Sequence, residues 1–163
     1  MARLEVLPKR LDILDVNDTN CQFRINIDVL NEAFGFNKAV YRKAGYPYNP
    51  SDYISGSING ERFRIWMPKL YGNSSGWKNS ISSDGKEFYE INEDKNAADW
   101  INVDKSGTEM LSLIFAKPDY KSPYRFLGVF KTGKIEHLKH TYERVSTKVK
   151  LIGNPVYRIE NLE

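Results

Sequence analysis

Carboxylates and a lysine in the middle of the chain could bind a divalent cation. Asp84 is followed by Glu93, Asp94 and Lys95, in the order D…E-x-K that metal-dependent nucleases use. In such a site two carboxylates hold Mg²⁺ and the lysine helps to activate water. An acidic connection exposed to solvent gives the same pattern, because the spacing is permissive. A small Mg²⁺-dependent nuclease and a solvated linker therefore both remain open.

The histidines and the cysteine add little further chemistry. His137 and His140 stand at H-x-x-H with Glu136 as the adjacent acid and no cysteine near them, so we expect them to be exposed or to contact phosphate rather than to bind zinc. Cys21 is far from both in sequence, and an inert buried thiol is its expected state. The sequence contains no P-loop, no G-x-S-x-G and no dinucleotide fingerprint. We expect no catalytic residue, no metal and no cofactor.

Charge is unevenly distributed along the chain, although the net charge is only +3. Between Asp84 and Glu109 there are eight acids and three lysines, a balance of −5. Between Lys117 and Lys150 there are nine basic residues and three acids, a balance of +6. Basic residues gathered on adjacent strands create a field that can hold a polyanion. A solvated strand face with ordinary lysines is the alternative.

Trp77 lies in a glycine- and serine-rich stretch, Tyr71 to Gly85, which we expect to be a loop closed by a turn at Asp84-Gly85. A tryptophan in such a loop is costly to leave exposed. It could plug the end of a barrel, or it could stack on a ligand or a base.

These residues must be positioned by strands, and the central ones follow residue 109. Met110 to Phe115 is a continuous apolar run stopped by Pro118, which predicts a strand buried on both faces. The next segment, 124–131, alternates with a period of two. We expect Tyr124, Phe126 and Phe130 on one of its faces.

The last amphipathic segment, 142–152, is predicted to be a single strand with a basic stripe. Its two faces separate by residue type. The buried face would hold Val145, Thr147, Val149 and Leu151, and the solvent face Arg144, Ser146, Lys148 and Lys150.

Other segments complete a mainly β chain. Further strands are expected near 3–7, at 61–67 after the Asn59-Gly60 turn, and at 87–91. A short helix capped by Asn26 or Asp28 and ended by Gly35 is expected to bury Val29, Leu30, Ala33 and Phe34. The tyrosine-rich stretch Phe36 to Tyr53 is a candidate binding loop. The pattern predicts an α+β, mainly β fold, with a twisted sheet closing towards a barrel and one or two short helices.

Length and composition are those of an ordinary soluble chain. With 163 residues, 40% hydrophobic and 28% charged, we expect a single domain over 1–163, with 1–20 forming an N-terminal strand or arm. The N-terminus lacks the apolar core of a signal peptide, and no stretch is long enough to span a membrane. One cysteine fits a reducing compartment. We therefore expect a cytoplasmic location and no membrane partner.

The order of several short motifs resembles the PUA-like superfamily, and within it the SRA-type and related modified-base readers of bacterial restriction systems. The first motif is G-W-x-N-x-I-x-x-D-G from Gly76 to Gly85, followed by a polar connection and the apolar strand Leu111 to Phe115. Y-R-F-L-G-V-F from Tyr124 and T-Y-E-R-V from Thr141 then follow. The resemblance covers about half of the chain, from Trp66 to Ile152.

The resemblance implies a pseudo-barrel that takes a flipped nucleotide, in many members a modified cytosine, into an aromatic-lined site. Flipping requires aromatic faces to restore stacking and basic residues to hold the displaced backbone. The implied base-binding residues are Trp77, Tyr71, Asn79, Asp84 and Tyr124, with Trp77 and Tyr71 stacking and Asn79 and Asp84 reading the base edge. The implied phosphate-binding residues are Arg125, Arg144, Lys148 and Lys150. The chain lacks the tight pocket motif of a methylcytosine reader.

We therefore expect a non-catalytic domain that recognises a modified base in DNA. We expect the DNA to be double-stranded and the domain to work with a fused or partner nuclease. Two other classes remain open. One is a small Mg²⁺-dependent nuclease using the carboxylates between Asp84 and Lys95. The other is a protein-interaction module using the Phe36 to Tyr53 loop. The sequence does not indicate an oligomeric state, or which base is read.

Overall fold

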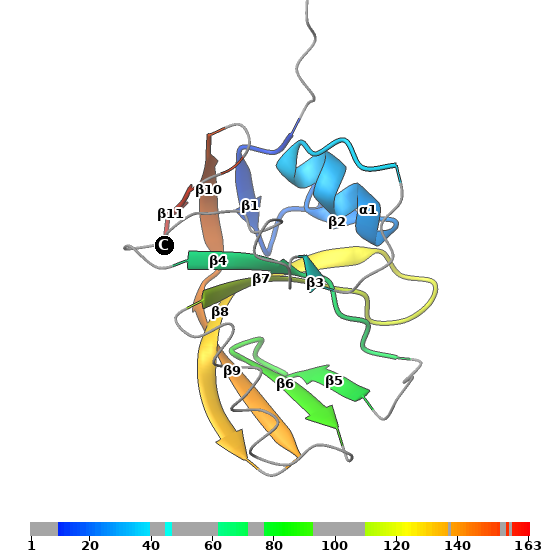
Figure 1. Cartoon of the computed structure of the whole chain (residues 1–163), viewed down its shortest axis with the longest axis vertical. Coiled ribbons are helices and arrows are strands. Elements are labelled where there is room, and N and C mark those ends of the chain that lie inside the picture. Colours follow the sequence, from blue (N-terminus) through cyan, green and yellow to red (C-terminus); the bar gives the residue numbers. More distant parts are fainter. Residues whose placement is uncertain are drawn as a thin grey trace, which may run out of the picture.

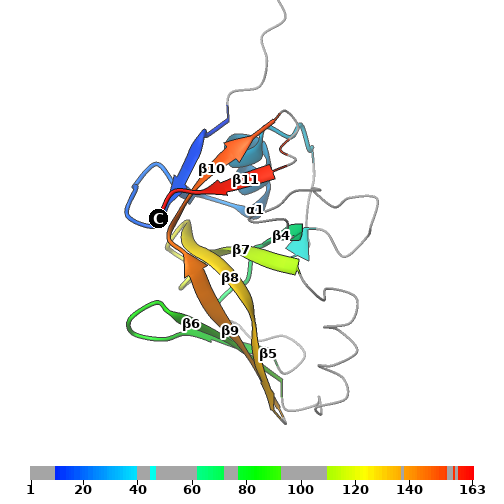
Figure 2. The same ribbon diagram turned by 90° about the vertical axis from the view of Figure 1, so that its left-hand side faces the viewer.

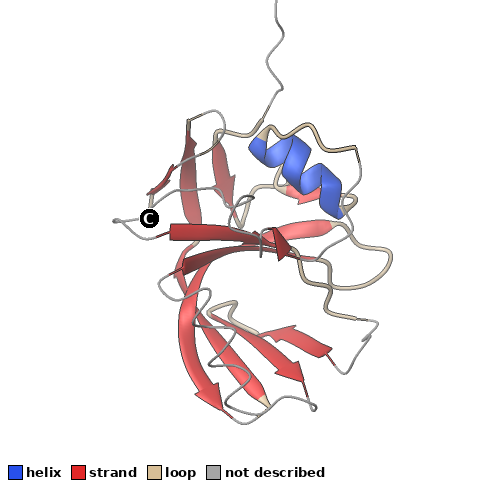
Figure 3. Cartoon of the chain, viewed as in Figure 1, coloured by secondary structure: helices blue, strands red, loops and turns tan. Residues whose placement is uncertain are grey.

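The computed structural model describes residues 10–39, 45–46, 62–71, 77–92, 110–136, 138–153, 156 and 158–163. These residues form a mainly β structure with one short helix (Figures 1 and 3). Their strands are organised in two sheets, one of three strands and one of eight. The predicted α+β, mainly β class is confirmed.

Several predicted features lie outside the described residues. They are the strand near 3–7, the Asn59-Gly60 turn, most of the tyrosine-rich loop, the acids and lysine at 93–95, and His137. No helix in the described part of the chain is long and apolar enough to cross a membrane.

The large sheet is built around the parallel pair of β4 (Arg62–Trp66) and β7 (Met110–Ala116). Its remaining pairings are antiparallel. The strand order is β3 (Gly45–Tyr46), β4, β7, β8 (Tyr124–Glu136), β9 (Lys139–Ser146), β6 (Glu87–Asn92) and β5 (Trp77–Ile81), with β2 (Gln22–Phe23) paired to the start of β8.

The small sheet is antiparallel and consists of β1 (Ile13–Asp15), β10 (Lys148–Ile152) and β11 (Arg158–Asn161), with β10 in the centre. Together with the helix it covers one side of the β4–β7–β8 layer. Strands β5, β6 and β9 lie on the other side (Figures 1 and 2). The central strands are therefore buried on both faces.

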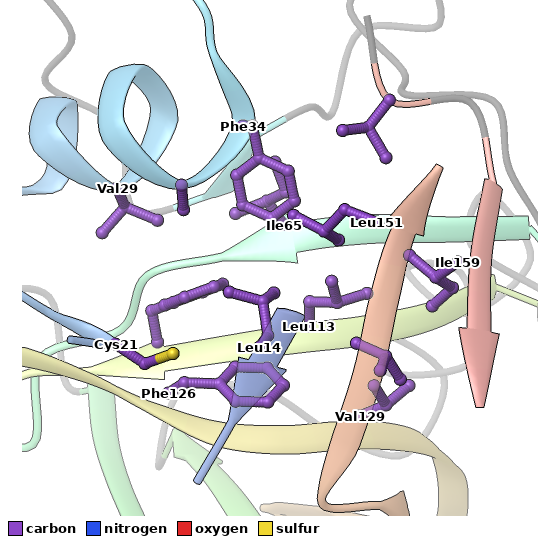
Figure 4. Close-up of a cluster of buried hydrophobic side chains, with 14 of the residues drawn as sticks. Leu14, Cys21, Val29, Phe34, Ile65, Leu113, Phe126, Val129, Leu151 and Ile159 are labelled. Atoms are coloured by element: carbon purple, nitrogen blue, oxygen red, sulfur yellow. The ribbon is translucent and has the colours of Figure 1, made fainter. Parts of the chain in front are cut away.

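The first of two hydrophobic cores fills the space between this layer, the helix and the small sheet (Figure 4). Strand β7 contributes Leu111, Leu113 and Phe115 from one of its faces. Leu14 of β1 and Leu151 of β10 reach the same core, and both are buried. This apolar contact holds the small sheet against the large one.

The second core lies on the opposite face of β7. Ile114 and Ala116 pack there with Trp66, Phe88 and other buried side chains. The ring centroids of Trp66 and Phe88 are 5.1 Å apart, in an edge-to-face arrangement. The prediction that 110–115 is a strand buried on both faces is thus confirmed.

The large sheet curls towards itself but does not close. Tyr142 of β9 reaches Trp66 of β4, with 5.2 Å between ring centroids. The strands at the two ends of the order, β3 and β5, are not hydrogen-bonded to each other in the described part of the chain. The predicted pseudo-barrel is therefore better described as a twisted, open sheet.

A β-bulge changes the predicted facing of side chains in β8. Ile114 pairs with Gly128 and Phe115 with Phe126, so Leu127 is the extra residue. Phe126 consequently packs in the first core and Phe130 in the second. The expectation that both share one face is wrong, because the bulge shifts the alternation by one residue.

The predicted single strand 142–152 is two strands in different sheets. The chain leaves the large sheet after Ser146 and enters the small sheet at Lys148. Alternation changes phase at this point, so Ser146 is buried and Val145 is 37% exposed. Val149 and Leu151 are buried as expected.

The predicted helix is confirmed, with a different N-terminus. A short α1 (Asn26–Asp28) continues directly into a wider π-helical segment, η1 (Val29–Ala33). Ile25 is the N-cap residue and makes no side-chain capping bond, while Oδ1 of Asn26 accepts a hydrogen bond of 2.9 Å from the Ile27 backbone. Gly35 follows the helix with a φ of 75°, as expected of a glycine that ends one.

Candidate functional site

Three polar side chains form a row across β5, β6 and β9. Asn79 pairs with Glu90, and Glu90 pairs with His140, in directly opposed positions of adjacent strands. Opposed residues project from the same face of a sheet. Glu90 and His140 are buried and Asn79 is half-buried. We call these three residues the polar row.

In the part of the chain that the structure describes, one polar atom of the polar row, on Asn79, lacks a hydrogen-bond partner. The Tyr142 hydroxyl donates to Oε1 of Glu90 at 3.1 Å, and the Tyr142 ring lies 4.1 Å from the His140 ring. The Oδ1 atom of Asn79 is buried without a hydrogen-bond partner there. An unpaired buried acceptor costs roughly 1–3 kcal/mol, so a donor supplied by a ligand would be stabilised.

An aromatic and cationic group borders the polar row. The Trp66 ring contacts Tyr142, and the Arg64 guanidinium carbon lies 5.1 Å from the Trp66 ring centroid. Arg64 Nε donates a hydrogen bond of 2.9 Å to Oγ of Ser112. These residues lie on the face of β4 and β7 that carries the second core. Together with the polar row they make up the inner-face site: Arg64, Trp66, Asn79, Glu90, Ser112, His140 and Tyr142.

The inner-face site has the chemistry to bind a planar polar molecule. Carboxylate and amide groups can accept and donate in one plane, as the hydrogen-bonding edge of a base requires. The aromatic residues of the site, Trp66 and Tyr142, are buried beside these groups. No cluster of three or more histidine, cysteine, aspartate or glutamate residues that could hold a metal was found among the described residues.

The predicted exposure is wrong for His140, and the predicted burial is confirmed for Cys21. His140 was expected to be exposed or to contact phosphate, but only 1% of it is exposed. It faces inward, opposed to Glu90 on the neighbouring strand and packed against the Tyr142 ring. Cys21 is buried as expected, and burial is the main cause that raises the pKa of its thiol.

Trp77 does not lie in a loop as predicted. It is the first residue of β5 and is opposed to Asn92 of β6. Side chains in this stretch alternate between the two faces of the sheet, with Lys78 and Ser80 exposed on the outer face. The alternation is not evident from the sequence, because most residues of the stretch are polar. The described part of the structure does not include the Trp77 side chain, so its stacking role stays a prediction.

Asp84 lies at the tip of the β5–β6 hairpin, whereas the polar row crosses these strands further along, at Asn79 and Glu90. Its Oδ1 accepts hydrogen bonds from Ser82 Oγ at 2.7 Å and from the Lys86 backbone at 3.0 Å. These bonds lower the pKa of the Asp84 carboxyl, the Lys86 bond having the larger effect. The structure therefore does not bring Asp84 to Asn79, the other predicted edge-reading residue, and it gives the carboxylate a local role in the turn.

Tyr71 lies close to Tyr124, the first residue of β8. Burial raises the pKa of Tyr124 to about 12, and the neighbouring Tyr71 adds to this effect. Tyr124 is 4% exposed and packs in the first core, so it does not share the inner face with Asn79. Arg125 is exposed beside it and is opposed to Ala116, whose side chain lies in the second core. Arg125 therefore projects from the same face as the inner-face site.

Arg144 is a packing residue rather than a free cation. A Cβ atom added to Gly128 would lie 2.6 Å from Arg144 Cδ, and one added to Gly85 would lie 2.7 Å from Nη1. The Arg144 side chain thus passes over Gly128, and its guanidinium group reaches Gly85. Nη1 of Arg144 donates a hydrogen bond to the Leu127 carbonyl at 3.4 Å. The expectation that its side chain points freely to solvent is wrong.

Lys148 and Lys150 lie on the small sheet, away from the strands that carry the polar row. Lys148 is opposed to Asp15, and Lys150 is opposed to Glu160. The predicted basic stripe therefore has acids beside it on both neighbouring strands. Lys150 is exposed and Lys148 is half-buried.

The sequence prediction missed most of the inner-face site. Arg64 and Trp66 were recognised only as the alternate face of a strand, and Glu90 only as one acid in an acidic segment. A usable signal was present in β6, where Glu90 and Asn92 stand in phase with the buried Phe88. Polar residues on the buried side of a strand point to hydrogen bonding that a core does not need.

Comparison with known proteins identifies the domain type. Residues 9–151 match the family model described as the SET and RING associated (SRA) domain. A search of curated protein sequences gives no significant match. Among solved structures, the chain is similar to that titled "The 5-Hydroxymethylcytosine-Specific Restriction Enzyme AbaSI", with a TM-score of 0.62 and 23% sequence identity. The similarity covers 85% of this chain and 42% of the AbaSI chain, and it shows a shared fold.

Proposed function

Because the chain belongs to the SRA family of DNA-binding domains, which recognise modified bases, we propose that it holds a modified cytosine, turned out of duplex DNA, against the polar row. The observation that supports this is the buried acceptor Oδ1 of Asn79, opposed to the carboxylate of Glu90. The exocyclic amino group of cytosine is a donor that a carboxylate or an amide oxygen accepts.

The proposed site also compensates the cost of turning a base out of the duplex. Unstacking and unpairing cost a few kcal/mol, which aromatic contacts and edge hydrogen bonds must offset. Trp66 and Tyr142 border the polar row, and Trp77 begins the strand that carries Asn79. We assign stacking to Trp77 and the reading of the base edge to Asn79 and Glu90.

With Asn79 and Glu90 assigned to the base edge, other residues of the inner-face site must contact the modification. Groups added at carbon 5 of cytosine leave its hydrogen-bonding edge unchanged, so they must be read by other residues of the inner-face site. Arg64 can donate hydrogen bonds there, and the Ser112 hydroxyl can donate or accept them. Such partners suit a hydroxymethyl group better than a methyl group. We therefore take 5-hydroxymethylcytosine as the first base to test.

The biological setting is part of the proposal. AbaSI is a restriction enzyme by its title, and this chain spans less than half of that protein's length. We propose that the domain serves a bacterial restriction system in the cytoplasm, with DNA cleavage carried out by a nuclease fused to it or bound as a partner.

A duplex panel with matched variants tests the proposed function. The duplexes differ at one central cytosine, which is plain, methylated or hydroxymethylated, and a further duplex carries methyladenine. The parent should prefer one modified cytosine. Asn79→Ala and Glu90→Gln should lose roughly five- to a hundredfold of that affinity, since a good edge contact contributes about 1–3 kcal/mol, while weak, salt-sensitive binding to plain DNA persists.

Ser80→Ala is the matched control, because Ser80 neighbours Asn79 on the exposed face of β5. It should bind as the parent does. A parent protein that binds all duplexes equally would contradict base recognition. Variants that keep the parental preference would remove the polar row from the site.

A further inference from the structure

A rigid turn between β7 and β8 presents an aromatic side chain to solvent. Tyr120 is 70% exposed, whereas most large apolar and aromatic residues in the described part of the chain are buried. The Asp119 carboxylate accepts bonds from the backbone of Lys121 at 2.9 Å and of Ser122 at 2.8 Å. It also accepts a bond of 2.9 Å from Ser122 Oγ. These three hydrogen bonds to one carboxylate stabilise the turn in this conformation.

Several cations lie in this turn and at the strand ends next to it. Lys121 Nζ lies 5.5 Å from the Tyr120 ring centroid, and Lys117 Nζ lies 5.8 Å from that of Tyr124. Lys69 pairs with Lys117 in a parallel bridge beyond the ends of β4 and β7. Exposed Arg125 follows at the start of β8. We call Lys69, Lys117, Tyr120, Lys121 and Arg125 the basic turn surface.

The single carboxylate of the turn does not cancel this charge. Asp119 is the one acid among residues 117–125, and its oxygens are hydrogen-bonded within the turn. Those bonds lower the pKa of the Asp119 carboxyl, the Ser122 hydroxyl bond first. Four cations around one acid leave an excess of positive charge, which matches a polyanion.

One residue of the basic turn surface, Arg125, shares a face of the sheet with the inner-face site. Arg125 projects from the same face of the sheet as that site, since it is opposed to Ala116 of the second core. Six residue steps separate Tyr71, which contacts Tyr124 electrostatically, from Trp77 at the start of β5. The Cα atoms of Tyr71 and Trp77 thus lie within about 22 Å of each other, a distance that several base pairs of DNA span.

We propose that the basic turn surface binds the DNA beside the recognised base, with its cations on phosphates and Tyr120 packed against a nucleotide. This inference rests on the proposed function. A rigid, exposed aromatic loses little conformational freedom on binding, and stacking on a base does not depend on sequence. The surface would therefore add affinity for modified and plain DNA alike, without adding discrimination.

Two variants separate the parts of this surface. Binding of the full chain to a duplex with one 5-hydroxymethylcytosine, and to the same duplex with plain cytosine, is measured by fluorescence anisotropy over a range of salt concentrations. Tyr120→Ala should weaken binding to both duplexes by roughly five- to a hundredfold with an unchanged salt slope. The double variant Lys117→Ala/Lys121→Ala should flatten that slope by about two units. Both variants should keep the parental ratio of affinities for the modified and the plain duplex.

Matched controls come from the outer face of the large sheet. Lys139 Nζ lies 4.3 Å from the Tyr89 ring centroid, a cation–π pair like that of Tyr120, so Tyr89→Ala should bind both duplexes as the parent does. Lys134→Ala removes a lysine whose side chain is 76% exposed and should leave the slope unchanged.

The outcomes distinguish this inference from the proposed function. Parental affinity in Tyr120→Ala with a parental slope in the lysine double variant would overturn it, and an acidic protein would become the partner to test. Loss of the modified-base preference alone would also overturn it, by moving Tyr120 into base recognition. If the parent shows no preference between the duplexes, the proposed function fails, while the slopes and the Tyr120 effect on plain DNA still decide the inference.

Discussion

At the scale of single residues, the domain places titratable and polar groups where water is scarce. The polar row is one case, and Tyr124 is another. Its hydroxyl is buried beside Tyr71 at the edge of the first core. Burial penalises the charged form of such a group, so the folded state holds the proton more tightly than the unfolded chain does.

Tyr124 should therefore make stability depend on alkaline pH. Its folded pKa is about 12, against about 10 in the unfolded chain, so the folded state binds more protons between these values. The contribution is fully present below pH 10 and is lost as the pH rises towards 12. Urea unfolding at pH 9 and pH 11 should show a larger loss of unfolding free energy in the parent than in Tyr124→Phe.

An equal loss in both proteins would contradict this assignment. Tyr120→Phe is a suitable control, because Tyr120 is 70% exposed. It should behave as the parent does.

At the scale of elements, β8 determines where side chains go. Its bulge at Leu127 shifts the alternation, so that Phe126 and Phe130 pack in different cores, and Gly128 has a φ of 125°. That backbone conformation is nearly restricted to glycine. Arg144 and the Ser146 carbonyl then occupy the space that a side chain at this position would need.

Gly128→Ala should destabilise the domain strongly. The new Cβ would lie 2.6 Å from Arg144 Cδ and 2.7 Å from the Ser146 carbonyl oxygen, which is backbone and cannot move easily. Backbone strain alone contributes roughly 1–3 kcal/mol, and the overlap adds to it. Gly35→Ala has a positive φ but meets only the flexible Arg10 side chain at 3.4 Å, so it should lose less unfolding free energy. Equal losses in urea unfolding would show that the overlap does not matter.

The small sheet gives a separate test of the phosphate contacts assigned to β10. Because Lys148 and Lys150 have acids opposite them, each should contribute at most one phosphate contact. The double variant Lys148→Ala/Lys150→Ala should flatten the salt slope of binding to any duplex by up to about two units and keep the melting temperature. An unchanged slope would remove both lysines from the interface. Arg144 is unsuited to this test, since its replacement would also remove packing.

Prediction from sequence succeeded for segments whose structure follows from a local sequence pattern alone. The apolar run of β7, the helix ended by Gly35 and the Asp84-Gly85 turn follow from local patterns. It failed at Leu127 and at Thr147, where a bulge and a change of sheet shift the alternation by one residue. Such shifts depend on partner strands, which a local pattern does not contain.

For the candidate site, residue types were easier to predict than their neighbours. Asn79 was selected for its amide and is in the polar row, although its role is untested. Glu90 and His140 were not selected, because their proximity depends on the pairing of β6 with β9 across more than forty residues of sequence. Tyr71 and Tyr124 came together, but on the other side of the central layer.

At the scale of the whole molecule, two cores share β4, β7 and β8. Leu113 and Ile114 are adjacent in β7 and belong to different cores. Loss of packing in either core therefore removes support from strands that the other needs. The described part of the chain should unfold as one cooperative unit.

Core variants on the two sides of the layer test this cooperativity. Leu14→Ala in the first core should lower the unfolding free energy by about 2–5 kcal/mol, and Phe88→Ala in the second by about 3–5 kcal/mol. Both should shift one urea transition that far-UV and near-UV circular dichroism report at the same midpoint. Two separate transitions in either variant would show that the cores unfold independently.

The bulge in β8 also bears on how such domains can diverge. Deleting one residue between Phe126 and Phe130 would exchange the side chains that face the two cores, so natural selection should hold the length of this stretch fixed. The turn at 117–123 precedes β8, and insertions there leave the strand's register intact. Lineages can therefore lengthen or shorten the turn that carries Tyr120 while the polar row stays in place. Affinity for DNA and choice of base could then evolve separately.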